Sequence, residues 1–269
     1  MGVFRFKKFS VENDRSAMKV NTDGVLLGAT MTLNPSDINL LDIGTGTGTI
    51  ALMAAQRLSD MDVPSDLPVE RSISLNLSEA GRKVGRNVMV GRSIYAIDID
   101  EASADEAGKN FEGSPWSDLL QAHHASLDEF SETFKDIRFD LIFSNPPYFE
   151  DSLTAPDKRK STARHTSDGL SYRDILDFAS KNLADDGRVS LVLPAEQEHD
   201  LCRYARMNGL HIFRLVYVRT VPRKQPSRII AEFSRSRCDA PCTVDLTIQN
   251  EGKYTSEYLS LMHEFYLFA

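Results

Sequence analysis

The sequence predicts an α/β fold with a mostly parallel sheet that is covered by helices on both faces. Three observations predict it. Short apolar runs typical of buried strands alternate with helical stretches along the chain. A glycine-rich stretch, 44–48, joins the first of these strands directly to a helix. The chain of 269 residues with 41% hydrophobic content is also long enough to bury one large core. We therefore expect a single domain over residues 1–269.

Seven apolar runs, most of them bounded by turn residues, indicate the strands of this sheet. Crossovers between parallel strands are right-handed, so the carboxyl ends of the strands meet at one edge, where ligands bind. The polar side chains that follow these runs are therefore candidates for one common site. The runs are 38–44, 93–100, 119–125, 139–144, 188–194, 211–220 and 228–235.

Helices are expected between and around these strands, and the first opens with Thr22 and Asp23, which are typical of a helix start. Residues 3–11 alternate loosely and indicate a short hairpin, so residues 1–33 are interpreted as an N-terminal cap and helix. Residues 59–92 are polar without a clear period, which predicts a surface insertion. The helical stretches are 22–33, 49–58, 101–111, 172–183, 195–207 and 257–268, the last of them a helix or a helix plus tail.

The glycine loop, DIGTGTG at 42–48, is built for close approach to a ligand. Glycine takes positive φ at no steric cost, and the N–H groups of the helix that follows face an anion or carboxylate. Thr49 stands where a dinucleotide-binding loop has its third glycine, which disfavours a nicotinamide enzyme. Asp98 ends the second strand, where a carboxylate suits a ribose diol. The alternatives are that Asp98 is a plain turn residue or that Asp100 takes its role.

The run FDLIFSNPPY at 139–148 ends in an unusual way for a buried strand. The side-chain oxygen of Asn145 and the backbone carbonyl of Pro146 can accept both N–H groups of a planar amine, which localises its lone pair. Proline fixes φ and therefore holds that carbonyl in place. Tyr148 offers an aromatic face for an extruded base. The alternative is a turn without chemistry.

DIGTGTG, AIDID at 96–100 and NPPY together resemble the S-adenosylmethionine-dependent methyltransferases that act on planar nitrogens. Further stretches resemble the bacterial tRNA1(Val) (adenine-N6)-methyltransferase family, and the similarity covers nearly the whole chain except 59–92. These stretches are MKVNTDGVLLGA (18–29), SPW (114–116), RKSTARHTSDGLSY (159–172), LVLP (191–194) and EFYLF (264–268).

The resemblance implies a Rossmann-like, seven-stranded methyltransferase sheet with an antiparallel edge strand and a small N-terminal hairpin cap. It implies methylation of N6 of adenine in tRNA, at position 37 of tRNA1(Val), with S-adenosylmethionine as cofactor and tRNA as partner. The alternatives are another planar nitrogen, as in a release-factor glutamine or an rRNA base, or cofactor binding without catalysis. Catalytic residues would be Asn145, Pro146 and Tyr148; cofactor-binding residues would be Thr22, Asp23, Asp42, Gly44, Gly46, Gly48, Asp98, Asn145 and Ser126, with Asp128 as the alternative to Ser126 at the adenine.

The charge distribution supports an RNA partner although the net charge is −8. The segment 203–237, expected to form C-terminal strands, holds nine basic residues and one acidic residue. Such a local concentration suits phosphates, although a solvated basic face would look the same. The loop after NPPY is also basic and is either an RNA contact or a solvated loop. The RNA-binding candidates are Arg159, Lys160, Arg164, Arg219, Arg223, Lys224 and Arg228.

Other functions are disfavoured by composition. No apolar stretch is long enough for a transmembrane helix, and the first residues lack the apolar core of a signal peptide. Three cysteines suggest free thiols in a reducing compartment. Cys238 and Cys242 have no nearby histidine, so no metal site is predicted. We expect a cytoplasmic protein, without a membrane or an obligate protein partner.

Overall fold

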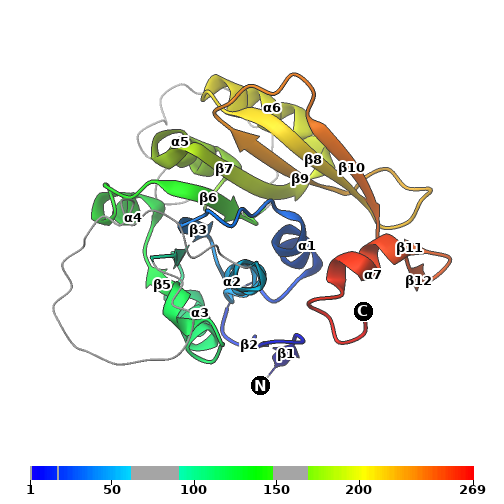
Figure 1. The fold of residues 1–269 in the computed structure, drawn as a ribbon, viewed down its shortest axis with the longest axis horizontal. Coiled ribbons are helices and arrows are strands. Elements are labelled where there is room, and N and C mark those ends of the chain that lie inside the picture. The colour runs from blue at the N-terminus through cyan, green and yellow to red at the C-terminus, as the bar shows by residue number, and fades with distance from the viewer. Residues whose placement is uncertain (1, 17, 62–90, 148–168) are drawn as a thin grey trace.

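The computed structural model describes residues 2–16, 18–61, 91–147 and 169–269. Its centre is a sheet of eight strands in the order β10-β8-β9-β7-β6-β3-β4-β5 (Figure 1). Most of the proposed insertion at 59–92 lies outside the described residues. The strands are β3 (Asn39–Ile43), β4 (Ser93–Asp98), β5 (Leu120–His124), β6 (Phe139–Ser144), β7 (Leu183–Pro194), β8 (His211–Arg219), β9 (Arg228–Ser234) and β10 (Cys242–Thr247).

Helices cover both faces of this sheet (Figure 1). One face carries α1 (Thr22–Thr30), α2 (Thr49–Asp60), α3 (Glu101–Glu112) and α7 (Ser256–Met262), and the other carries α4 (Leu127–Thr133), α5 (Tyr172–Asn182) and α6 (Glu198–Met207).

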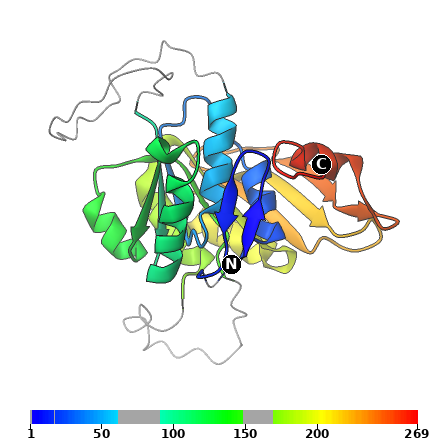
Figure 2. The same cartoon turned by 90° about the horizontal axis from the view of Figure 1, so that it is seen from below.

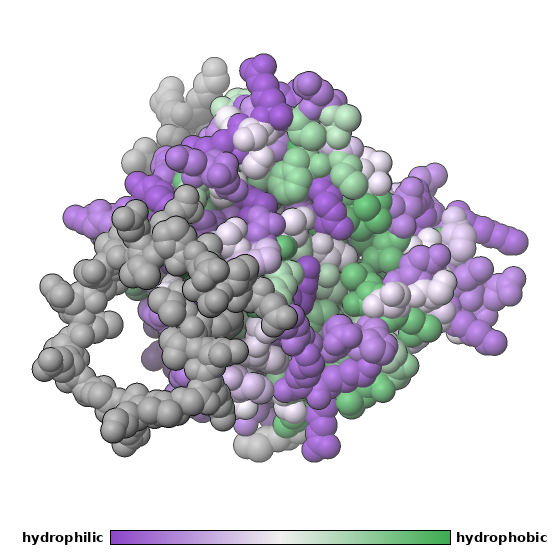
Figure 3. All heavy atoms as spheres, viewed as in Figure 1, coloured by the Kyte–Doolittle hydropathy of each residue, from purple (hydrophilic) through white to green (hydrophobic). Residues whose placement is uncertain are grey.

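Two hydrophobic cores result from the alternation of side chains along each strand. On β3, Leu40 packs into the core under α1 and α2, whereas Leu41 packs into the core under α5 and α6. Unlike these two cores, the outer surface carries many polar side chains. In the view of Figure 3, polar side chains lie mainly around the outline, and apolar ones show mainly in its central part. None of the helices in the described ranges is long and apolar enough to span a membrane.

The predicted fold class is confirmed, but two details of the sheet differ from expectation. The antiparallel strand, β9, lies between β7 and β8 and not at an edge. An eighth strand, β10, pairs in parallel with β8 and forms that edge. Four of the six residues of β10 are exposed, so its sequence lacks the apolar run that marks the other strands. Because β9 turns back, β8 and β10 end at the same edge of the sheet as the parallel strands β3 to β7.

The predicted N-terminal hairpin is present as β1 (Val3–Arg5) and β2 (Ser10–Glu12). In Figure 2 it lies in front of α2, between α3 and the C-terminal segment. Phe6 stacks between Phe9 and Tyr266, with ring centroids 4.4 and 6.0 Å away, so both ends of the chain share one aromatic cluster. A second small hairpin, β11 (Gln249–Asn250) with β12 (Lys253–Tyr254), and helix α4 were not expected from the sequence.

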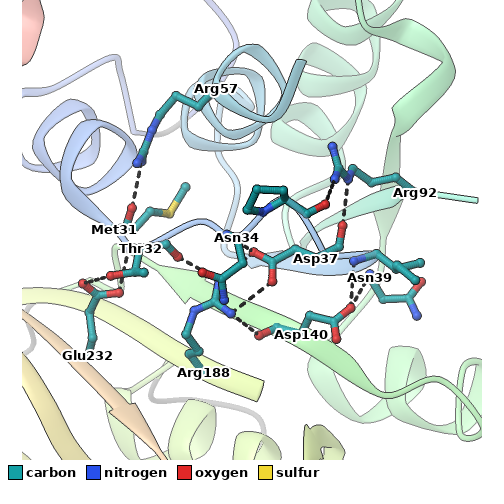
Figure 4. A network of polar contacts seen from close by, with 12 residues as sticks. Met31, Thr32, Asn34, Asp37, Asn39, Arg57, Arg92, Asp140, Arg188 and Glu232 are labelled. Carbon is teal, nitrogen blue, oxygen red and sulfur yellow. Dashed lines mark hydrogen bonds and ion pairs between the residues drawn. The ribbon is translucent and has the colours of Figure 1, made fainter. Parts of the chain in front are cut away.

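A network of buried charges lies at the amino end of the sheet and fastens the loop between α1 and β3 (Figure 4). Arg188 on β7 pairs with Asp37 in that loop at 2.6 Å and donates to the carbonyl of Thr32 at 2.9 Å. Arg92 donates to the carbonyl of Asp37 at 2.7 Å. Asp140 on β6 is partly buried and accepts from the N–H of Ile38 in the same loop at 2.8 Å and from that of Asn39, the first residue of β3, at 3.0 Å. We call Asp37, Arg92, Asp140 and Arg188 the amino-end network.

Glu232 on β9 extends this pattern toward α1 (Figure 4). Its fully buried carboxylate accepts from the backbone N–H of Thr32 at 2.8 Å and pairs with Arg214 at 2.5 Å. Arg57 on α2 donates to the carbonyl of Met31 at 2.8 Å. Buried charges that are paired and hydrogen-bonded in this way specify one geometry for the chain segment they hold.

Candidate active site

The glycine loop adopts the backbone conformation that its sequence predicts. Gly44, Gly46 and Gly48 have φ of 71, 56 and 78°, in the left-handed region that favours glycine. A Cβ on Gly48 would lie 2.4 Å from a ring carbon of Phe111, so α3 can pack against the loop only if that residue is glycine. The N–H of Gly44 donates to the carbonyl of Ile97 at 2.9 Å, which ties the loop to β4.

Asp98 reaches the glycine loop from the end of β4. Its Oδ2 accepts from the N–H of Gly46 at 2.9 Å, and its Oδ1 accepts from the N–H of Asp100 at 2.9 Å. Burial raises the pKa of this carboxyl. Asp100, the alternative candidate, instead caps α3 by accepting from the N–H of Ser103 at 2.9 Å. The structure therefore places Asp98, and not Asp100, against the loop.

Asp42 lies beneath the loop and does not line the pocket described below. Its side chain is fully buried and accepts from the hydroxyl of Thr45 at 2.7 Å. Burial raises the pKa of Asp42 to about 7. This residue thus reaches a ligand only through the loop that it supports.

Asn145 stands at the carboxyl end of β6, and its residue is 6% exposed. The preceding Ser144 donates to the carbonyl of Ile43 at 2.6 Å, which holds the end of β6 against β3. The Nδ2 of Asn145 lies 3.4 Å from the Oδ1 of Asn21 and 3.6 Å from the sulfur of Met18. A pocket opens between this asparagine and the glycine loop. Its lining consists of Met18, Lys19, Val20, Asn21, Gly24, Gly44, Thr45, Gly46, Thr47, Thr49, Ile50 and Asn145.

One wall of this pocket is a segment that we call the N-terminal strap, residues 12–16 and 18–21. Glu106 on α3 anchors it: the buried carboxylate accepts from the N–H groups of Asp14, Arg15 and Ser16 at 2.7–2.8 Å. Asn110, one turn later, donates to the carbonyl of Thr47 in the glycine loop at 2.9 Å and exchanges two bonds with the backbone of the strap. The strap, α3 and the glycine loop are therefore one connected unit.

Thr22 and Asp23 lie beside the pocket but outside its lining. The N-cap of α1 is Asn21, whose Oδ1 accepts from the N–H of Gly24 at 2.8 Å, so Thr22 is the first helical residue. Asp23 forms an ion pair with Arg228 at 2.8 Å. A predicted cofactor residue and a predicted RNA contact are thus partners of each other.

Ser126 has a structural role in addition to the one proposed for it. It caps α4, with its hydroxyl donating to Glu129 at 2.8 Å and accepting from the N–H of Glu129 at 3.2 Å. The same serine lines an open cavity beside the ends of β4 and β5, together with Ile99. Ile99 is 74% exposed and was not predicted as a site residue. The one feature of the sequence that could have indicated it is an isoleucine between two aspartates. Asp128 is exposed and does not line this cavity.

The basic candidates fall into two groups. Arg219 forms an ion pair with Asp245 on β10, as Arg228 does with Asp23. Arg223 and Lys224 are exposed in the turn between β8 and β9, at the same edge of the sheet as the pocket. Four further candidates lie outside the described residues: Tyr148, Arg159, Lys160 and Arg164.

Comparison with known proteins agrees with this geometry. Residues 35–220 match a family model described as "RMKL-like, methyltransferase domain". The chain is 38% identical to the tRNA1(Val) (adenine(37)-N6)-methyltransferase of Parabacteroides distasonis, over 98% of this chain and 97% of that one. It is 34% identical to the protein of the same name from Flavobacterium psychrophilum, over 98% and 99% of the two chains.

Solved structures of low sequence identity share the fold. A predicted O-methyltransferase from Agrobacterium tumefaciens aligns with a TM-score of 0.60 at 13% identity, covering 90% of this chain and 96% of that one. The 16S rRNA N2 G1207 methyltransferase of T. thermophilus, in complex with AdoMet and guanosine, aligns with a TM-score of 0.51 at 18% identity, covering 87% of this chain and 50% of that one.

Proposed function

Because the chain belongs to the family of the tRNA1(Val) (adenine(37)-N6)-methyltransferases, we propose that it methylates N6 of adenine 37 in tRNA1(Val), with S-adenosylmethionine as methyl donor. The observation that carries this proposal is the near full-length similarity at 38% identity. The position of Asn145 beside the glycine loop supports it, because that arrangement brings an amide acceptor to the cofactor site.

The residues at the carboxyl edge fit S-adenosylmethionine. Its ribose hydroxyls are donors, and Asp98 is a partly buried carboxylate that forms no ion pair within the described ranges. Its amino-acid end requires close backbone approach, which Gly44 and Gly46 permit. Ile99 offers an exposed apolar side chain for the adenine ring, next to Ser126. Asp42 would support the cofactor site indirectly, by holding Thr45 of the glycine loop. Thr22 and Asp23 would do so by forming the start of α1, next to the pocket.

The chemistry follows from the acceptors around the target amine. Bound S-adenosylmethionine supplies an electrophilic methyl group on a sulfonium. The lone pair of an exocyclic adenine amine is delocalised into the ring, so the Oδ1 of Asn145 and the carbonyl of Pro146 would accept its two N–H groups and localise the pair for attack. Proximity then supplies much of the acceleration. The amine loses a proton only after it has gained the methyl group, so no histidine or lysine is needed as a base before attack.

RNA contacts are proposed for the residues whose charge is available at this edge. Tyr148 would stack on the extruded base, and Arg159, Lys160 and Arg164 would contact the backbone from the loop that follows it. Arg223 and Lys224 would contact phosphates from the exposed turn between β8 and β9. Arg219 and Arg228 already bind carboxylates, so a phosphate would have to compete with them.

The test is transfer of labelled methyl groups to a tRNA1(Val) transcript, followed by mass analysis of the nucleosides. We expect N6-methyladenosine from the parent transcript and none from a matched transcript with guanosine at position 37. A release-factor protein and rRNA fragments serve as competing substrates. Methylation of glutamine or of an rRNA base in place of tRNA would replace the proposed substrate. Tight cofactor binding without transfer to any of them would indicate a binding protein.

A further inference from the structure

We propose that Asn21 is a positioning residue that sets the orientation of the Asn145 amide, so that its oxygen and not its NH2 group meets the target amine. The proposal rests on the proposed function, because it concerns how that reaction obtains its acceptor. The two residues are 124 positions apart in the chain and meet at 3.4 Å between Nδ2 and Oδ1.

The orientation of the Asn21 amide follows from its two backbone partners. The backbone N–H of Gly24 can only donate, so the atom that meets it at 2.8 Å is the Asn21 oxygen. The carbonyl of Lys19 can only accept, so the atom that meets it at 3.1 Å is the Asn21 nitrogen. Either contact alone determines which end of the amide is which, and both agree.

This orientation passes to Asn145. The Oδ1 of Asn21 is an acceptor, so the Asn145 atom that faces it is the NH2 nitrogen. The thioether sulfur of Met18, a weak acceptor 3.6 Å from the same nitrogen, favours the same choice. An amide turned by 180° would set oxygen against oxygen and oxygen against sulfur. The carbonyl oxygen of Asn145 is therefore on the opposite end of the amide, away from the strap.

The orientation matters because the two ends of an amide have opposite roles. An adenine amine presents N–H donors, so an NH2 group turned toward it would repel it, and localisation of the lone pair would be lost. The contact of 3.4 Å is long for a hydrogen bond. It needs only to favour one orientation over the other, and one modest hydrogen bond does so by roughly 5–10-fold.

The partners of Asn145 are themselves held firmly. Met18 and Asn21 belong to the N-terminal strap, which the carboxylate of Glu106 anchors through three backbone N–H groups. The Oδ1 of Asn13 also accepts from the N–H of Val20 at 3.1 Å. Orientation of the reacting amide is thus supplied from a segment that carries none of the NPPY residues.

Two substitutions separate this role from the helix cap. Aspartate and serine are both good N-caps. In Asn21→Asp, the carboxylate only accepts, so it gives up the bond to the carbonyl of Lys19 but keeps the cap on Gly24 and favours the same orientation of Asn145. In Asn21→Ser, the hydroxyl is shorter and can donate or accept, so it favours neither orientation.

The experiment measures single-turnover methylation of tRNA1(Val), the cofactor dissociation constant and the melting temperature of each variant. We expect Asn21→Ser to lose about 2-fold in rate, because the productive orientation falls from most of the molecules to about half of them, with cofactor affinity and melting temperature close to the parent values. Asn21→Asp should restore the parent rate, so the two variants differ in the same measurement. Thr255 caps α7, and its hydroxyl accepts from the backbone N–H of Tyr258 at 3.2 Å. Thr255→Ala removes this cap and shows what the loss of a helix cap alone does to the methylation rate.

The outcomes distinguish the two proposals. A parent rate in Asn21→Ser, or an equal loss in Asn21→Asp, would overturn the positioning role while the enzyme still methylates tRNA. Asn21→Ser and Thr255→Ala could also lose the same rate of methylation at the same drop in melting temperature. That result would likewise assign Asn21 a role in capping α1 alone. Absence of methylation by the parent chain would instead refute the proposed function itself.

Discussion

Carboxylates are buried at both ends of the sheet, but they form an ion pair at the amino end and none at the carboxyl edge among the residues that the structure describes. At the amino end, Asp37 is paired with Arg188 and accepts from the N–H of Asn34, and its backbone carbonyl accepts from Arg92 (Figure 4). At the carboxyl edge, burial raises the pKa of Asp42 and of Asp98, and neither forms an ion pair with the Lys and Arg residues that the structure describes.

The difference separates stability from function. The amino-end network pairs the charges of Asp37 and Arg188 within the chain, so these charges hold a loop and two strands together. The carboxyl edge keeps two costly carboxylates beside a loop with three glycines in left-handed conformations. Such local costs are expected where a ligand completes the set of interactions, and they are offset elsewhere in the fold. Substitutions at the amino end should therefore lower stability, whereas substitutions at the carboxyl edge should lower activity or raise stability.

The largest effect on stability is expected at the amino end. Arg188→Met removes one partner of a buried ion pair and leaves Asp37 buried without it, which should lower the free energy of unfolding by about 3–5 kcal/mol. Urea denaturation measures it. The double variant Arg188→Met/Asp37→Asn is the control, because it removes both charges and should recover part of the loss. A decrease below about 1 kcal/mol would mean that the network does not act as a unit.

Asn145→Ala should lower activity and not stability. It removes one acceptor of the target amine, so the single-turnover rate should fall by about 10²–10³, equivalent to about 3–4 kcal/mol. The glycine loop and Asp98 are untouched, so the cofactor dissociation constant should stay close to that of the parent. Calorimetry and quenched-flow methylation give the two values. Methylation at the parent rate would mean that NPPY is a turn without a catalytic role.

Asp42→Asn should stabilise the protein, in contrast to Arg188→Met. The pKa of Asp42 is about 7 in the folded chain, against an ordinary value of 3.8, so its contribution to stability is complete below pH 3.8 and is lost as pH rises to about 7. An asparagine does not titrate. The free energy of unfolding should therefore rise by roughly 2–4 kcal/mol at pH 8, with the gain disappearing toward pH 4. Denaturation across this pH range tests it, and a gain that does not change with pH would contradict the assignment.

The smallest effects concern the basic turn. Arg223→Ala and Lys224→Ala should each lower the slope of log affinity for tRNA against log salt by roughly 0.7–1. Arg219→Ala and Arg228→Ala are matched controls, because these arginines already pair with Asp245 and Asp23. They should change the slope little. Equal slopes in all four variants and the parent would favour a solvated basic face.

The sequence predicted the elements whose signal is local. Apolar runs located seven strands, and the glycine loop and Asn145 were correctly expected to follow β3 and β6. The eighth strand, β10, was missed because an exposed edge strand has no apolar run. Helix α4 was missed although SLDE at 126–129 carries its capping box, which is too short a signal to decide a helix by itself.

The missed part of the site is non-local. Asn21 and Met18 meet Asn145 across more than 120 positions, and nothing in their neighbourhood indicates it. Glu106 looks like an ordinary acidic residue of an amphipathic helix, yet it is buried under the strap. Arg228 and Asp23 were assigned separate roles because sequence spacing does not show that β9 begins beside α1.

The N-terminal strap also has a consequence for the order in which the protein is made. A ribosome synthesises the strap before any strand of the sheet, but Glu106 follows Asp14 by 92 residues. At about 5–20 residues per second, the strap waits roughly 5–20 s for its anchor. During that time the pocket lacks a wall, even after the glycine loop has emerged. Cofactor binding by a nascent chain would therefore report that α3 has left the ribosome and that the two segments have joined.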